Sequence, residues 1–86
     1  MLPTVEVRVA GREVPLTHQE LALLAFLLRH RGRVFSRSEL LRKVWGVDHY
    51  GQSRTVDIHV RRLRLKLGRS AASLETVRGA GYKYRQ

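Results

Sequence analysis

The sequence predicts an α+β fold in which three helices lie between two short antiparallel β-hairpins. Apolar residues recur every three or four positions in three stretches, each of which follows a residue suited to begin a helix. Near both ends of the chain, short runs that alternate apolar and polar residues flank glycine-containing turns. With 86 residues and 43% hydrophobic content, the chain can bury one modest core. We therefore expect residues 1–86 to form a single domain.

The first hairpin is predicted close to the N-terminus. Residues 5–9 alternate valine with a charged residue, and this period of two indicates a strand with one buried face. Residues 10–12 favour a turn, and residues 13–16 a short returning strand. The N-terminal sheet is therefore expected to be short, with two clear strands and residues 2–4 as a candidate third.

Two capping boxes predict the starts of the first two helices. Thr17 and Ser36 are each followed three residues later by a glutamate that can bond back to the capping residue. Residues 21–28 are apolar on nearly every side, so we expect the first helix in the middle of the core. Gly32 and Gly46 are expected to end the two helices.

A third helix is predicted from about residue 53 to residue 67, with Ser53 as its cap and Gly68 after its end. Four apolar residues spaced 4, 3 and 4 apart form its expected core stripe: Val56, Val60, Leu63 and Leu67. A short polar stretch follows at residues 69–73. The second hairpin then comprises a strand at residues 76–78, a turn at residues 79–81 and a strand at residues 82–84.

The charge balance points to a polyanionic partner. Seventeen Lys and Arg against seven Asp and Glu give a net charge of +10, well above what a small domain needs for solubility. Nucleic acid is the first candidate because neutralising phosphates releases counterions. An anionic membrane surface, ribosomal RNA and a general solubility charge are the alternatives.

Composition excludes several other classes of protein. The absence of cysteine excludes disulfides, thiolate zinc sites and cysteine nucleophiles. No apolar run approaches the roughly 20 residues that span a bilayer, and the N-terminus lacks a signal-peptide pattern. We therefore expect a cytoplasmic protein without a membrane partner.

The third helix carries the expected nucleic-acid chemistry. A polar row lies beside the core stripe and comprises Thr55, His59, Arg62 and Lys66. A third row lies opposite the core and comprises Arg54, Ile58, Arg61 and Leu65. An α-helix fits the major groove of B-DNA, where arginine can bond bidentately to guanine. Ile58 could contact a thymine methyl group. Arg61 and Arg64 could reach phosphates or pair with Asp57.

The alternative for this helix is an ordinary solvated face. Such faces usually interleave acidic residues with basic ones, whereas Asp57 is the lone acid here. His59 could equally be a polar surface residue. Leu65 could contact the second hairpin or form a small protein–protein patch. The pattern favours insertion of the helix into a DNA groove.

Three further residues are candidates outside this helix. A basic hairpin can lie along the minor groove, where Arg78 could read its width and negative potential. An ordinary hairpin that caps the core is the alternative. Arg37, at the first position of the second helix, could hold a phosphate. The indole of Trp45 could do the same, or could be an aromatic residue at the core edge.

Enzymatic function is not expected, nor is a cofactor. The four histidines are scattered, without metal-ligand spacing, and the sequence lacks a phosphate-binding glycine loop, a nucleophile elbow and paired carboxylates. A non-catalytic RNA-binding protein is the remaining rival. RNA modules usually present stacking aromatics on an open sheet, and here Tyr82 and Tyr84 lie on a short hairpin.

The chain resembles the C-terminal effector domain of the OmpR/PhoB family of bacterial response regulators over essentially its whole length. Four groups of residues in this order carry the resemblance: Leu16-Thr17 with Glu20; residues 33–41 with Val44-Trp45-Gly46; residues 54–64 with Lys66-Leu67; and Thr76-Val77-Arg78-Gly79 with Gly81-Tyr82. The resemblance implies a winged helix-turn-helix, with the third helix in the major groove and the wing at the minor groove.

The resemblance also assigns contact residues. The matched recognition-helix positions are Arg54, Thr55, His59, Arg61, Arg62 and Arg64; the backbone-contact positions are Arg37 and Trp45, and the wing contacts are Thr76 and Arg78. From these we expect Arg62, Thr55 and His59 to read base edges and Arg78 to enter the minor groove. The expected phosphate contacts are Arg37, Arg54, Arg61, Arg64 and Lys66.

The family further implies partners. Its members commonly bind direct repeats in double-stranded DNA as head-to-tail dimers, and a free monomer is expected. In activators, the loop that corresponds to residues 47–52 touches RNA polymerase. The chain differs from the family pattern in lacking a phosphoacceptor receiver domain, in its short N-terminal sheet and in carrying Leu65 where a polar residue is common.

Overall fold

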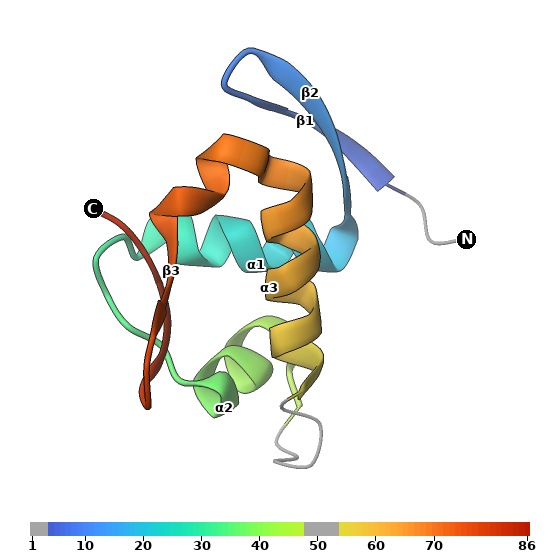
Figure 1. Cartoon of the computed structure of the whole chain (residues 1–86). Coiled ribbons are helices and arrows are strands. Elements are labelled where there is room, and N and C mark those ends of the chain that lie inside the picture. Colours follow the sequence, from blue (N-terminus) through green and yellow to red (C-terminus); the bar gives the residue numbers. More distant parts are fainter. Residues whose placement is uncertain (1–3, 48–53) are drawn as a thin grey trace.

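The computed structural model describes residues 4–47 and 54–86, in which two hairpins flank a helical centre (Figure 1). In chain order the elements are β1 (Thr4–Val9), β2 (Arg12–Thr17), α1 (His18–Arg29), α2 (Arg37–Leu40), η1 (Leu41–Trp45), α3 (Arg54–Leu67), η3 (Gly68–Ser73), β3 (Leu74–Val77) and β4 (Gly81–Tyr84). The fold is α+β, as the sequence predicts.

The N-terminal hairpin pairs β1 with β2 in antiparallel register, from Thr4 opposite Thr17 to Val9 opposite Arg12. Both expected strands are present. Burial comes mainly from β2, whose Val14 and Leu16 enter the core, whereas the valines of β1 are only half-buried. The candidate third strand at residues 2–4 lies outside the described residues except for Thr4, which belongs to β1.

Helix α1 begins with the predicted capping box. The Thr17 side chain accepts from the backbone N–H of Glu20, and the Glu20 carboxylate accepts from the backbone N–H of Thr17. The helix lies in the core as expected, with Leu23, Leu24 and Leu27 buried, although Leu28 is 38% exposed. The helix also ends at Arg29, before Gly32.

The second helix changes geometry along its length. Ser36 and Glu39 form the predicted capping box at the start of α2. After one turn the chain widens into the π-helical segment η1, which ends at Gly46 as expected. The sequence does not indicate this change, because the apolar spacing of a single turn cannot distinguish α from π geometry.

Helix α3 buries the predicted stripe: Val56, Val60, Leu63 and Leu67. The expected cap at Ser53 lies outside the described residues. After Leu67 the chain continues as the 3₁₀ segment η3, where the sequence predicts only a polar stretch.

The C-terminal hairpin pairs β3 with β4 and is joined to the rest of the protein at Phe35. Leu74 lies opposite Tyr84, and Val77 opposite Gly81. The first strand begins two residues earlier than predicted and ends one residue earlier, at Val77. Arg78 therefore lies in the turn. Phe35 and Tyr82 exchange both backbone hydrogen bonds at 2.9 Å, which places residue 35 beside β4 as a short extra bridge.

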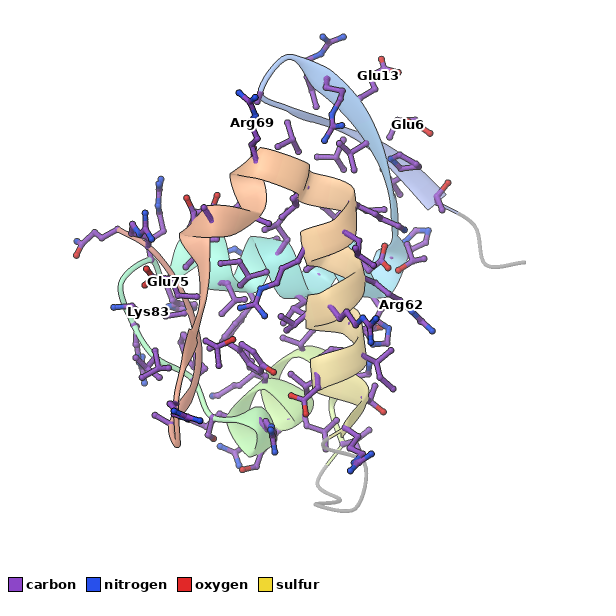
Figure 2. The ribbon with its side chains drawn as sticks, viewed as in Figure 1. Glu6, Glu13, Arg62, Arg69, Glu75 and Lys83 are labelled. Carbon is purple, nitrogen blue, oxygen red and sulfur yellow. The ribbon has the colours of Figure 1, made fainter. Side chains whose placement is uncertain are left out.

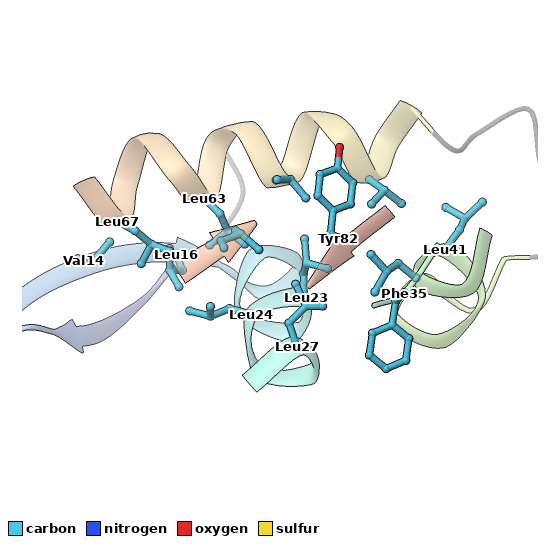
Figure 3. Packing of buried hydrophobic residues seen from close by; sticks show 14 residues of the cluster. Val14, Leu16, Leu23, Leu24, Leu27, Phe35, Leu41, Leu63, Leu67 and Tyr82 are labelled. Carbon is cyan, nitrogen blue, oxygen red and sulfur yellow. The ribbon is translucent and has the colours of Figure 1, made fainter. Parts of the chain in front are cut away.

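One hydrophobic core holds these elements together. Helix α1 crosses behind α3 in Figure 1, and Figure 3 shows core side chains between the two helices. β2, α1, α2, α3, β3 and β4 all contribute to it, and Leu16, Leu23, Leu27, Leu40 and Leu63 are completely buried. Within residues 4–47 and 54–86, no helix is both long and apolar enough to cross a membrane. The core fixes α3 with its opposite side open to solvent.

Candidate nucleic-acid interface

The face of α3 opposite the core is basic and open. Arg54, Arg61 and Arg62 are exposed, and Figure 2 shows Arg62 projecting from α3 on the side away from the C-terminal hairpin. Ile58 and Leu65 lie on the same exposed side. This surface can present guanidinium donors together with an apolar contact to a partner that fits around a helix.

His59 is held in one orientation beside Trp45. Its Nδ1 lies 2.8 Å from the backbone oxygen of Thr55, and a carbonyl oxygen can only accept, so Nδ1 carries the hydrogen. The ring meets Trp45 edge to face, with centroids 5.1 Å apart. Trp45 is half-buried and packs against the core, which is the position expected of an aromatic residue at the core edge. In neutral His59, Nε2 is thus left as a hydrogen-bond acceptor.

Asp57 joins three elements. Its Oδ1 accepts from Arg37 Nε of α2 at 3.0 Å and from the Tyr82 hydroxyl of β4 at 2.6 Å. The suggested partners Arg61 and Arg64 are therefore wrong, because α2 and β4 approach Asp57 from outside its own helix. Burial first, and then the hydrogen bond to Asp57, raises the pKa of Tyr82. The hydroxyl remains a donor at neutral pH.

Arg64 contacts the C-terminal hairpin. Its guanidinium donates to the backbone oxygen of Leu74 from Nε at 3.3 Å and from NH2 at 2.9 Å, and to Thr76 Oγ1 at 2.7 Å. The guanidinium carbon also lies 5.8 Å from the centre of the Tyr82 ring. The phosphate contact expected of Arg64 stays a prediction, because Nε and NH2 are engaged within the protein by these hydrogen bonds and NH1 is not among them.

Lys66 is likewise engaged inside the molecule. Its Nζ lies 2.6 Å from Oε1 of Glu20 in α1, a residue that is 1% exposed. The expected position on the polar row of α3 is correct in register, but the ammonium turns to this buried carboxylate. Sequence reasoning missed Glu20 as its partner, since the two residues lie on different helices.

The tip of the hairpin adds a second basic element. Arg78 and Thr76 are exposed. A pocket of about 310 Å³ lies between Arg37 and the hairpin, lined also by Thr76, Val77, Tyr82 and the turn residues 79–81. The structure therefore brings Arg37, Thr76 and the open side of the turn to one concave surface.

Metal chemistry has no candidate in the described part of the chain. No three His, Asp or Glu side chains among residues 4–47 and 54–86 are grouped so that they could hold a metal ion. Besides Glu20, sequence reasoning overlooked Asp57 as a junction between elements and Tyr82 as its hydrogen-bond donor. Asp57 is the lone acid in a basic helix, but the sequence offers Arg61 and Arg64 of the same helix as partners and gives no signal for Arg37 or Tyr82.

Comparison with known proteins identifies the family. The model of the family "Transcriptional regulatory protein, C terminal" matches residues 11–84. The sensory transduction protein RegX3 of Mycobacterium leprae is 46% identical over 80 residues, which cover 90% of this chain and 40% of that protein. The transcriptional regulatory protein VxrB of Vibrio cholerae is 50% identical over 80 residues, which cover 93% and 32%. The chain thus spans well under half the length of these relatives.

Solved structures agree in fold. The Klebsiella pneumoniae RstA DNA-binding domain, in complex with the RstA box, matches with a TM-score of 0.79 at 33% identity, covering 90% of this chain and 80% of that one. The DNA-binding domain of Escherichia coli CpxR matches with a TM-score of 0.78 at 30% identity, covering 98% and 97%. The chain belongs to the OmpR/PhoB-type family of C-terminal transcriptional regulatory domains, which are DNA-binding winged helices and not enzymes.

Proposed function

We propose that residues 1–86 form the DNA-binding unit of a transcriptional regulator that recognises a specific sequence in duplex DNA. In this proposal α3 enters the major groove and the hairpin at about residues 76–84, the wing, lies at the minor groove. The observation that carries it is the open face of α3, where Arg54, Arg61 and Arg62 are exposed beside Ile58. A helix with this face suits the width of the major groove.

The proposed DNA contacts are of two kinds: contacts to base edges, which read the sequence, and contacts to phosphates, which position the domain. Arg62, Thr55 and His59 read base edges, because they share the polar row of α3. Arg54 and Arg61 hold phosphates and set the register, since each is exposed and positively charged. Arg37 bonds to Asp57 through Nε only and its side chain is 58% exposed, so its remaining donors hold a phosphate. Arg78 inserts into the minor groove from the tip of the wing. Trp45 supports the ring of His59.

Arg64 and Lys66 have a different role in this proposal. The guanidinium of Arg64 is occupied by Leu74 and Thr76, and the ammonium of Lys66 by Glu20. Releasing Arg64 to a phosphate would remove two hydrogen bonds from the Leu74 oxygen, and releasing Lys66 would leave the buried Glu20 carboxylate without its countercharge. We therefore assign both residues to positioning α3, with Thr76 as the wing residue that Arg64 holds.

Two homologous domains support DNA as the partner. RstA was solved with the RstA box, and the AdeR DNA-binding domain, 31% identical with a TM-score of 0.74, was solved with an intercistronic region. By analogy we propose a direct-repeat site bound head to tail by two copies that are monomers when free. Contact of residues 47–52 with RNA polymerase, action in the cytoplasm and linkage to a response regulator belong to the same proposal; of residues 47–52 only Val47 is among the described residues.

Selection of bound sequences from a random duplex pool at near-physiological salt tests this function. The expected result is an enriched direct repeat with half-sites about one helical turn apart. Affinity for the selected duplex should fall steeply with salt, as phosphate contacts require. No enriched sequence, together with equal binding to RNA or single strands, would exclude a sequence-specific regulator and indicate a general polyanion binder.

A further inference from the structure

We infer that Asp57 and Arg64 fix the wing at a set distance from α3, and so determine how many base pairs separate the major-groove and minor-groove parts of the DNA site. The inference deepens the proposed function and rests on it. It assigns the two residues as positioning residues, which act on DNA recognition through the wing rather than by touching the duplex.

The two contacts hold different strands of the wing. Asp57 accepts from the Tyr82 hydroxyl on β4 at 2.6 Å. Arg64 donates to the Leu74 oxygen on β3 at 2.9 Å and to Thr76 Oγ1 on the same strand at 2.7 Å. Residues seven apart lie on one side of a helix and are about 10 Å apart along its axis. One side of α3 thus holds both strands, at two heights.

Two separated attachments prevent motions that one would allow. A single hydrogen bond leaves a hairpin free to pivot about it, whereas contacts to both strands resist pivoting and sliding. The planar guanidinium of Arg64 bonds to the Leu74 oxygen through two nitrogens, which also fixes its orientation. Asp57 is in turn bonded by Arg37, so α2 is tied to the same junction.

Burial strengthens the junction at its centre. Tyr82 is buried, and Asp57 and Arg64 are each half-buried, so these hydrogen bonds face limited competition from water. The wing is therefore carried as part of the α3 framework rather than as a loose arm, even though its tip at Arg78 is exposed.

A rigid distance has a measurable consequence on DNA. Inserting one base pair moves the minor-groove contact by about 3.4 Å and rotates it by about 35° relative to the major-groove contact. A wing fixed on α3 cannot follow both changes, whereas a loosened wing can follow part of them.

The first experiment measures binding to the selected site and to versions with one base pair inserted or deleted between the two parts. The wild-type domain should lose about tenfold or more in affinity on each altered duplex, the scale of a lost base contact. In Tyr82→Phe and Arg64→Lys this penalty should fall below about threefold. Arg64→Lys keeps the positive charge, and a lost phosphate contact would weaken binding to all three duplexes equally rather than lower this penalty.

Tyr84→Phe is the matched control. It removes a hydroxyl from β4, the strand that also carries Tyr82. Among the described residues, the Tyr84 hydroxyl has no side-chain partner comparable to Asp57, which accepts from the Tyr82 hydroxyl. It should keep the wild-type spacing penalty. If Tyr82→Phe and Arg64→Lys also keep that penalty, or weaken binding equally on all three duplexes, the inference is wrong.

A measurement without DNA separates this inference from the proposed function. Hydrogen exchange of the β4 backbone amides should be several-fold faster in Tyr82→Phe and Arg64→Lys than in Tyr84→Phe, while amides within α1 stay unchanged. Unchanged exchange at β4 would overturn the positioning role. If β4 loosens but even the wild type shows no spacing penalty, the minor-groove placement of the wing fails, and the spacing rule fails with it.

Discussion

Lys66 Nζ donates to Oε1 of Glu20 at 2.6 Å, and the same oxygen accepts the backbone N–H of Thr17 at 2.9 Å. One carboxylate therefore caps α1 and pairs with the far end of α3. Glu20 is 1% exposed, whereas the Lys66 side chain keeps 31% of its surface in water. The pair fixes the crossing of the central helix with the helix proposed to enter DNA.

Replacing Glu20 by Gln should lower the free energy of unfolding by about 1–3 kcal/mol. Glutamine still accepts from Thr17, but Lys66 loses its countercharge while its surroundings stay partly buried. Urea unfolding at pH 7 measures the change. Glu6→Gln, at an exposed position of β1, is the control and should alter stability by less than about 0.5 kcal/mol. Equal effects of the two substitutions would contradict this account.

Acid should destabilise the domain, because three glutamates titrate below their ordinary range. Burial acts to raise the pKa of Glu20, but the hydrogen bonds from Lys66 and Thr17 and the charge of Lys66 outweigh it and lower the pKa. The backbone N–H of Ser36 lowers the pKa of Glu39, and a hydrogen bond from Arg85 lowers that of Glu75.

Groups whose pKa is lowered by folding stabilise the folded state above their unfolded pKa, here 4.5. That stability is lost as the pH falls through the lower folded values. We expect thermal midpoints, measured at fixed ionic strength, to be nearly constant just above pH 4.5. They should fall as the pH is lowered from 4.5 towards 2. A midpoint that is flat across this interval would show that these carboxylates contribute nothing.

Leu63 and Leu65 on α3 offer a direct comparison of buried and exposed leucine. Leu63 is completely buried, whereas Leu65 is 74% exposed. Leu63→Ala should cost about 2–5 kcal/mol, because it leaves a cavity in the core. Leu65→Ala should change stability by less than about 0.5 kcal/mol. Chemical denaturation of both variants checks this, and a large loss at Leu65 would mean that an undescribed contact covers it.

Gly81 and Gly79 should respond differently to alanine. Gly81 has a φ of +141°, and a Cβ there would overlap the Phe35 carbonyl oxygen. Gly79 has a φ of +77°, but a Cβ would meet nothing within 4 Å. Backbone strain should cost about 1–2 kcal/mol in Gly79→Ala and about 1–3 kcal/mol in Gly81→Ala. Overpacking should add about 1–3 kcal/mol for Gly81→Ala alone. Thermal unfolding compares them, and equal losses would show that the approach of Phe35 is not tight.

Arg62→Ala and Arg61→Ala separate base reading from phosphate binding. Arg62→Ala should cost about 1–3 kcal/mol on the selected duplex and relax specificity at one base pair. Arg61→Ala should weaken all duplexes nearly equally and lower the salt slope by about one unit. Binding titrations at several salt concentrations distinguish the two outcomes. If Arg62→Ala weakens every sequence equally, Arg62 is a phosphate contact; an unchanged slope removes Arg61 from the phosphate group.

The parts of the fold that local sequence determines were predictable. The capping boxes at Thr17 and Ser36 and the stripe from Val56 to Leu67 depend on residues within a few positions of each other. The widening at η1 and the 3₁₀ turn at η3 were not predicted, because both arise where a helix meets the packing of other elements.

The candidate site shows the same division. Helical spacing places Arg54, Arg61 and Arg62 on the open face of α3. Spacing alone could not show that Arg64 turns to Leu74 or that Lys66 turns to Glu20, since those partners depend on tertiary packing. For long, flexible cations, the register on a helix predicts where the side chain begins but not what its charged end contacts.

The bridge between Phe35 and Tyr82 also bears on how the domain folds. It closes a loop that runs from residue 35 to residue 82. The chain loses the entropy of closing this long loop before the hydrogen bonds of the bridge can stabilise it. The helices and the N-terminal hairpin need only nearby residues, so we expect them to form earlier. Weakening the bridge should then leave the rate of folding almost unchanged and speed unfolding. The lifetime of the folded wing therefore depends on the bridge between Phe35 and Tyr82.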